Sequence, residues 1–227
     1  MPKVNEKYFE SKKNKILEAA FSVCMKKPIY SVTMSDIISE TGLSQGGVYK
    51  YFSNIDDIFI ALTNKIQESH CLKDKIDEIF NSLLQPETIL RNIFIFITEN
   101  ILSDLTRYGK ISFELDTLYA NNPKREVYYL SNVNFTSDFD YLIMQLYTYI
   151  GQKIEEGYFN PIVKPNSIFM FLIASYDGIH RDIILSKCYP AKGRISEDWI
   201  FDEKELMNTL YESIIHLLRP QGGENII

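Results

Sequence analysis

With 227 residues, of which 45% are hydrophobic and 24% are charged, the chain is long enough for one large or two small folded domains. Its apolar runs, such as Ile93 to Ile97, are far too short to span a bilayer, and its charged first fifteen residues contain no apolar signal-peptide segment. We therefore expect a cytoplasmic protein without a membrane partner, whose three widely separated cysteines are reduced thiols.

The net charge of −6 is distributed unevenly along the chain. Residues 1–53 contain eight lysines and five acidic residues, a balance of +3, which leaves a balance of −9 for the remaining 174 residues. A positively charged N-terminal segment favours contact with the phosphates of a nucleic acid. A solvated helix face explains each individual lysine equally well.

Three helices are predicted at the start of the chain. The first covers residues 6–27 and ends at a proline, because proline cannot continue a helix. Thr33 and Asp36 have the spacing of a capping box, which starts a second helix. Gly42 stands where that helix must end in the left-handed region, and Ser44 can cap a third, very short helix. The pattern predicts a helix-turn-helix unit.

The third helix carries side chains suited to reading DNA. Gln45 and Lys50 can reach base edges, and Tyr49 and Tyr51 can donate hydroxyl groups to phosphates. Two glycines in its first turn cost roughly 1 kcal/mol each relative to alanine, and close approach to a groove wall would offset that cost. A helical hairpin that packs only on its neighbours is the alternative interpretation.

This stretch resembles the N-terminal DNA-binding domain of TetR-type bacterial repressors. The resemblance is carried by Thr33-x-x-Asp36-Ile37, Gly42-Leu43-Ser44, Gly46, Val48-Tyr49 and Tyr51-Phe52. It implies phosphate contacts from Thr33, Ser44, Tyr49 and Tyr51, and it places base-contacting positions at Gln45, Gly47 and Lys50. Gly46 is expected at the groove because of the close backbone approach described above. The chain departs from the family pattern at Gln45 and at Asp56-Asp57, where basic residues are common.

A fourth helix follows the third, DNA-contacting helix, which we call the reading helix, and leads into the acidic part of the chain. A tilt of the fourth helix would therefore move the reading helix. We expect an all-α protein with a helix-turn-helix DNA-binding domain over residues 1–53 and a linking helix over 54–70. Residues 71–227 are expected to form a helical ligand-binding and dimerisation domain. Its predicted helices cover about 72–84, 87–103, 107–119, 124–156, 164–187 and 202–219.

Aromatic residues are concentrated in the middle of the chain. Twelve of the 56 residues from Phe94 to Tyr149 are Phe or Tyr, which suggests an apolar pocket between helices. Each ring is individually better explained as core, and Glu114 could either balance a cationic ligand or be solvated. The candidate pocket residues are Phe94, Phe113, Glu114, Phe139 and Tyr147.

The last two predicted helices are apolar on more than one side, so each needs more than one packing partner. In the family that the chain resembles, two such helices from each subunit form a four-helix dimer interface. The candidate interface residues are Phe169, Leu172, Ile179, Ile183, Leu206, Leu210, Ile214 and Leu217.

The resemblance implies a transcriptional repressor that binds a palindromic operator as a homodimer and is released by a small, largely apolar inducer. A DNA-binding dimer that activates transcription or needs no inducer is the alternative. We expect no enzyme, because no serine or cysteine lies in a nucleophile motif and the three histidines are scattered. We also expect neither a metal site nor a cofactor, because no second ligand pair accompanies His70-Cys71.

Overall fold

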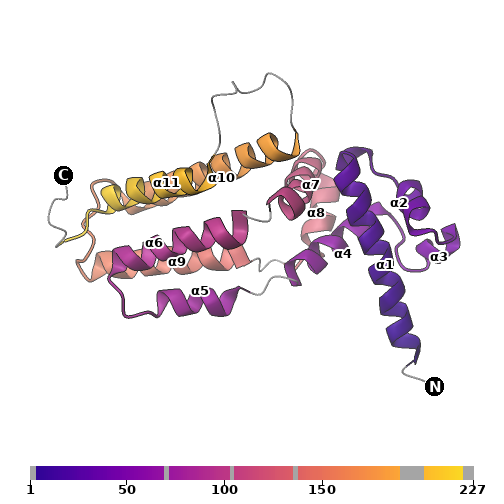
Figure 1. The fold of residues 1–227 in the computed structure, drawn as a ribbon, viewed down its shortest axis with the longest axis horizontal. Helices are drawn as coiled ribbons and strands as arrows, with labels where there is room; N and C mark the ends of the chain where they lie inside the picture. The colour runs from indigo at the N-terminus through magenta and orange to yellow at the C-terminus, as the bar shows by residue number, and fades with distance from the viewer. Residues whose placement is uncertain (1–3, 69–71, 103–104, 135–137, 190–201, 222–227) are drawn as a thin grey trace. The chain divides into compact units, whose positions relative to one another are not determined.

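The computed structural model describes residues 4–68, 72–102, 105–134, 138–189 and 202–221, and within these residues it is helical with no β-strand (Figure 1). The all-α prediction is confirmed. The chain divides into two compact units, which are described separately. The first unit comprises residues 1–70 and 107–135, and the second comprises residues 71–106 and 136–227.

The first unit is built around one core to which every helix in it contributes. Its elements are α1 (Val4–Lys26), the 3-10 turn η1 (Ile29–Ser31), α2 (Met34–Thr41), α3 (Gln45–Tyr49), α4 (Ile55–Glu68), α7 (Lys110–Ala120) and α8 (Pro123–Leu130). Ile16, Ile37, Val48, Phe59 and Leu115 are all buried in this core. The core therefore joins α7 and α8 to the four N-terminal helices α1, α2, α3 and α4.

Residues 107–135 pack in the first unit although they follow the expected domain boundary at residue 70. The rings of Tyr119 on α7 and Tyr129 on α8 stack at 4.1 Å, and the Tyr129 hydroxyl lies 2.9 Å from the Thr63 hydroxyl on α4. The two helices thus close over the linking helix. The functional assignments of the domains stay a prediction, and the last two residues of the predicted linking helix lie outside the described residues.

The predicted helix over residues 124–156 is wrong, because the chain forms two helices there. α8 ends at Leu130, and α9 covers Asp138–Glu155. The side chain of Asn64 on α4 forms hydrogen bonds with two backbone groups just after α8. Its amide donates to the Asn132 carbonyl at 3.2 Å, and its oxygen accepts the Asn134 N–H at 2.8 Å, so neither group is available for a helical hydrogen bond. Hydrogen bonds from a distant helix therefore end α8.

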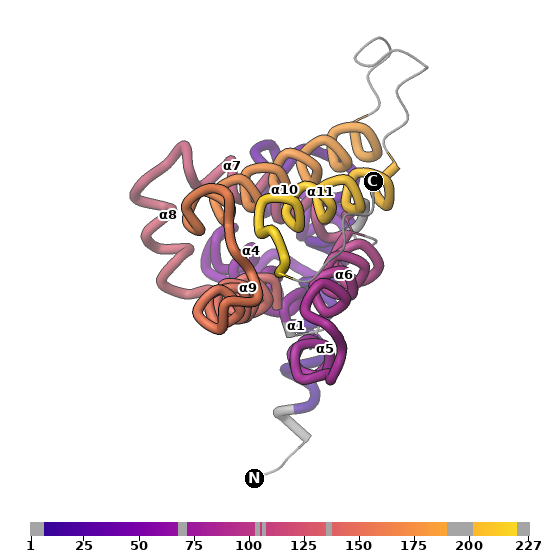
Figure 2. Tube along the Cα trace, turned by 90° about the vertical axis from the view of Figure 1, so that its left-hand side faces the viewer, coloured from indigo at the N-terminus to yellow at the C-terminus, as the bar shows by residue number. Residues whose placement is uncertain are grey.

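The second unit consists of helices that lie side by side (Figure 2). Its elements are α5 (Lys73–Phe80), α6 (Pro86–Phe96), the π-helical turn η2 (Ile97–Ile101), α9, α10 (Pro165–Cys188) and α11 (Glu203–Leu218). α10 and α11 lie side by side, α11 contacts α6, and α5 contacts both α6 and α9. No helix among the described residues is long and apolar enough to cross a membrane.

Candidate nucleic-acid interface

The capping box that starts α2 is confirmed. The Thr33 hydroxyl oxygen accepts the Asp36 N–H at 3.3 Å, and the Asp36 carboxylate accepts the Thr33 N–H at 2.8 Å. Lys27 lies 2.6 Å from the same carboxylate, and its hydrogen bond, together with those from Thr33, lowers the pKa of Asp36 to about 2. The Thr33 hydroxyl also donates to Asp36 at 2.6 Å, so this hydrogen is already used inside the cap and must be released before Thr33 can donate to a phosphate.

The turn between α2 and α3 has the predicted geometry. Gly42 adopts φ 64°, the left-handed conformation that glycine enters at little cost. The Ser44 oxygen caps α3 by accepting the Gly47 N–H at 3.1 Å. Val48 is fully buried and Phe52 almost so, which anchors the opposite side of this short helix in the core. α3 therefore has one inward face and one outward face.

The outward face of α3 consists of the residues predicted to contact DNA. Gln45, Gly46, Tyr49 and Lys50 are exposed, whereas Gly47 and Tyr51 are half-buried. Lys50 lies over the Phe9 ring of α1, 4.7 Å from its centroid, and the Tyr51 ring lies 5.0 Å from the same ring. Phe9 thus holds the Lys50 ammonium beside the reading helix, a contact that the sequence pattern did not indicate.

The two glycines of α3 differ in their surroundings. A Cβ added at Gly47 would lie 3.1 Å from the Ser44 oxygen and 3.6 Å from Leu43 Cβ, so a side chain there would disturb the cap. A Cβ added at Gly46 would find no neighbouring atom of the described chain within 4 Å. Packing within the protein therefore accounts for Gly47 but not for Gly46.

The acidic start of α4 is explained by contacts with α7 and α8. The Asp56 carboxylate accepts hydrogen bonds from the Arg125 guanidinium at 2.5 to 3.2 Å and from the Tyr119 hydroxyl at 2.8 Å. Asp57 accepts the Tyr128 hydroxyl at 2.7 Å. These carboxylates anchor α8, and this use explains why the chain lacks a basic residue at the start of α4.

The candidate ligand-pocket residues do not form one site. Phe113 and Glu114 belong to the first unit, whereas Phe94, Phe139 and Tyr147 belong to the second. In the second unit, Phe139 stacks on Tyr176 at 4.4 Å and Tyr147 lies 4.6 Å from Phe169. Much of the aromatic excess is therefore used in ring contacts between helices.

Glu114 requires a correction, because its carboxylate is neither solvated nor placed to balance a ligand. It lies 2.8 Å from the Lys110 ammonium and accepts the Ile29 N–H at 2.6 Å. Both partners belong to the first unit, and the Glu114 side chain is only 12% exposed.

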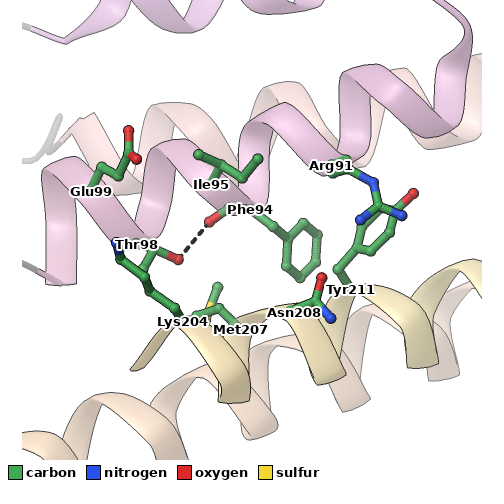
Figure 3. Close-up of a pocket in the computed structure, with 9 residues that line it drawn as sticks. All are labelled: Arg91, Phe94, Ile95, Thr98, Glu99, Lys204, Met207, Asn208 and Tyr211. Atoms are coloured by element: carbon green, nitrogen blue, oxygen red, sulfur yellow. Dashed lines mark hydrogen bonds between the residues drawn. The ribbon is translucent and has the colours of Figure 1, made fainter. Parts of the chain in front are cut away.

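A cavity of about 320 Å³ lies between α6 and α11 in the second unit (Figure 3). Of the predicted pocket residues, only Phe94 lines it, and its ring points into the space between the two helices. Phe94, Met207 and Tyr211 form its buried apolar part, while Arg91 lies over the Tyr211 ring at 4.4 Å. The rest of the lining is provided by Ile95, Thr98, Glu99, Lys204 and Asn208.

Half of the candidate interface residues are core residues of the single chain, which corrects their assignment. Their side chains face the neighbouring helices of the same unit and cannot reach a partner; they are Leu172, Ile183, Leu210 and Ile214. Phe169, Ile179, Leu206 and Leu217 remain half-exposed. The exposed side of α10 instead carries Met170, Phe171, Ala174, Asp177 and Arg181.

Other chemistry is sparse in the described part of the chain. No cluster of three or more His, Cys, Asp or Glu side chains among these residues could hold a metal ion. Burial raises the pKa of the Cys24 thiol to about 12, which makes this thiol a poor nucleophile.

Comparisons with known proteins agree with this geometry. Residues 16–62 match the model of the bacterial regulatory proteins, tetR family. The chain is 26% identical over 185 residues to the uncharacterized HTH-type transcriptional regulator YfiR of Bacillus subtilis, covering 78% of this chain and 82% of that protein. A TetR regulator from Haloarcula marismortui has a similar fold, with a TM-score of 0.64, 17% identity and coverage of 92% and 100% of the two chains. The fatty acid degradation regulator FadR from Bacillus halodurans gives a TM-score of 0.62, 18% identity and coverage of 92% and 97%.

Proposed function

We propose that this chain, whose helix-turn-helix matches the tetR family of bacterial regulatory proteins, is a TetR-type transcriptional regulator that represses transcription as a homodimer on a palindromic operator. One short reading helix covers only a few base pairs, so specificity requires two reading helices about 34 Å apart, related by a dyad. In this proposal, Gln45 and Lys50 contact base edges, while Ser44, Tyr49 and Tyr51 contact phosphates. The Ser44 hydroxyl donates to no acceptor among the described residues, which suits this role.

The observation that carries the proposal is the open space around Gly46. Glycine in a helix costs roughly 1 kcal/mol relative to alanine. No atom of the described chain would obstruct a methyl group at this exposed position, so the fold itself does not require glycine. Close approach of a wall of the DNA groove to the α3 backbone explains why this position is glycine.

Replacing Gly46 by alanine is therefore expected to preserve or raise thermal stability while weakening DNA binding about tenfold, because the added methyl group pushes the backbone from the groove. The probe is a duplex recovered by in vitro selection from a random pool with the wild-type protein, and binding is measured by fluorescence anisotropy.

The matched control is Gly151→Ala, which adds a methyl group to a helical glycine of α9 that also has open space around it. This control is expected to leave DNA affinity unchanged. Unchanged affinity of the Gly46→Ala protein itself would refute close approach of α3 to the groove.

We further propose that a small, largely apolar molecule binds in the cavity between α6 and α11 and releases the operator. The cavity volume of about 320 Å³ lies at the lower end of the range of ligand sites. Phe94, Met207 and Tyr211 provide an apolar surface, and the polar rim offers Arg91 and Asn208 to orient a ligand. The ligand can shift the equilibrium only by its difference in affinity for the bound and released conformers.

Asn208→Trp is expected to abolish ligand response while leaving operator affinity intact. Asn208 is exposed at the rim of the cavity, so an indole at this position can fill the cavity without disturbing the core. A thermal-shift screen of apolar compounds identifies a stabilising ligand, and its effect on the melting temperature is then compared between the proteins. Gln152→Trp on the exposed face of α9 is the control. Equal stabilisation of wild type and Asn208→Trp would exclude this cavity, and a screen without hits favours a regulator that needs no inducer.

A further inference from the structure

The junction between α1 and α2 contains two backbone groups that the local chain cannot pair. α1 ends at Lys26, and the Cys24 carbonyl would continue the helical pattern by accepting the N–H of residue 28. Residue 28 is proline, which has no N–H. The N–H of Ile29 stands at the start of the following 3-10 turn, where helical partners are also missing.

An ion pair on α7 satisfies both groups. The Lys110 ammonium donates to the Cys24 carbonyl at 2.8 Å, and the Glu114 carboxylate accepts the Ile29 N–H at 2.6 Å. Lys110 and Glu114 also lie 2.8 Å from each other, one helical turn apart. The pair therefore bridges the break that Pro28 makes in the backbone.

The burial of this pair distinguishes it from the Lys26–Glu40 ion pair, which links α1 to α2 directly. The side chains of Lys110 and Glu114 are 8% and 12% exposed, whereas those of the Lys26–Glu40 pair are 63% and 34% exposed. A buried charge is costly unless it is paired and hydrogen-bonded, so this pair disfavours arrangements of the junction in which either charge loses its partners. An exposed pair constrains its helices far less.

We propose that Lys110 and Glu114 are positioning residues that set the direction in which α2 leaves α1 and thereby aim α3 at DNA. They act through the backbone of residues 24–29, which leads through η1 into the capped start of α2. A displacement of α7 that withdraws the pair releases this junction, so α7 controls the reading helix without touching DNA. The proposal rests on the proposed operator binding.

The test is the double variant Lys110→Met/Glu114→Leu, which removes both charges together and leaves neither one buried alone. Hydrogen–deuterium exchange at residues 27–33 is expected to accelerate on the order of tenfold, while exchange in α4 stays unchanged. Affinity for the selected duplex is expected to fall on the order of tenfold, because α3 is no longer held in one orientation. Lys26→Gln/Glu40→Gln, which removes the exposed pair, is the control and should change neither quantity.

A milder variant, Lys110→Met/Glu114→Gln, carries the test if the first variant does not fold. In this variant the amide oxygen of the glutamine at position 114 still accepts the Ile29 N–H, so the acceleration of exchange and the loss of DNA affinity are both expected to be intermediate. Unchanged exchange at residues 27–33 overturns the proposal, and so does accelerated exchange with unchanged DNA affinity. If the wild-type protein selects no duplex, the proposed operator binding fails, while the exchange data still decide whether the pair fixes the junction.

Discussion

Replacing Gly178 by arginine is expected to convert the proposed homodimer to a monomer and to lower affinity for the proposed operator by about 100-fold or more, because two linked reading helices bind far more tightly than one. Gly178 is half-buried on α10 and lies about one helical turn from exposed Ala174 and Arg181. A Cβ added there would meet no neighbouring atom of the described chain within 4 Å. Arginine is therefore compatible with the single chain, but its bulk and charge would separate two closely packed helices of a dimer.

The measurement is sedimentation velocity of the purified variant, followed by titration of the selected duplex. Circular dichroism should remain that of a folded helical protein, because the site is open in the single chain. Gln152→Arg places the same side chain on the exposed face of α9 and should remain dimeric. A Gly178→Arg protein that sediments as a dimer would exclude the centre of α10 from the interface.

Removing the Asp56 carboxylate, as in Asp56→Ala, is expected to lower the free energy of unfolding by about 2–3 kcal/mol, because it leaves two polar groups without their partner. One is the hydroxyl of buried Tyr119, and the other is the partly exposed guanidinium of Arg125. Partial exposure of Arg125 moderates the cost. The contact holds α7 and α8 against the start of α4.

Urea unfolding monitored by circular dichroism measures this effect, and Tyr128→Phe is the matched control. That substitution removes only the hydrogen bond from an exposed hydroxyl to Asp57 and should change stability by no more than about 0.5 kcal/mol. A comparably small change for Asp56→Ala would mean that core packing alone holds α8 in place.

The sequence by itself determined the helix-turn-helix, because the signals that specify it act within four residues. The Thr33–Asp36 cap, the left-handed Gly42 and the Ser44 cap each involve backbone groups of the same turn, and all three have the predicted geometry. The all-α class followed in the same way from local periodicity.

Only the tertiary structure decided which residues cover the DNA-reading unit and which remain available to partners. Asp56 meets Arg125, and Glu114 meets the Ile29 backbone, across 69 and 85 residues of chain. Leu210 and its buried neighbours face inward, although their pattern suited an interface equally well. Helical periodicity identifies an apolar face but carries no information about which element packs against it, because that contact depends on how distant segments meet in space.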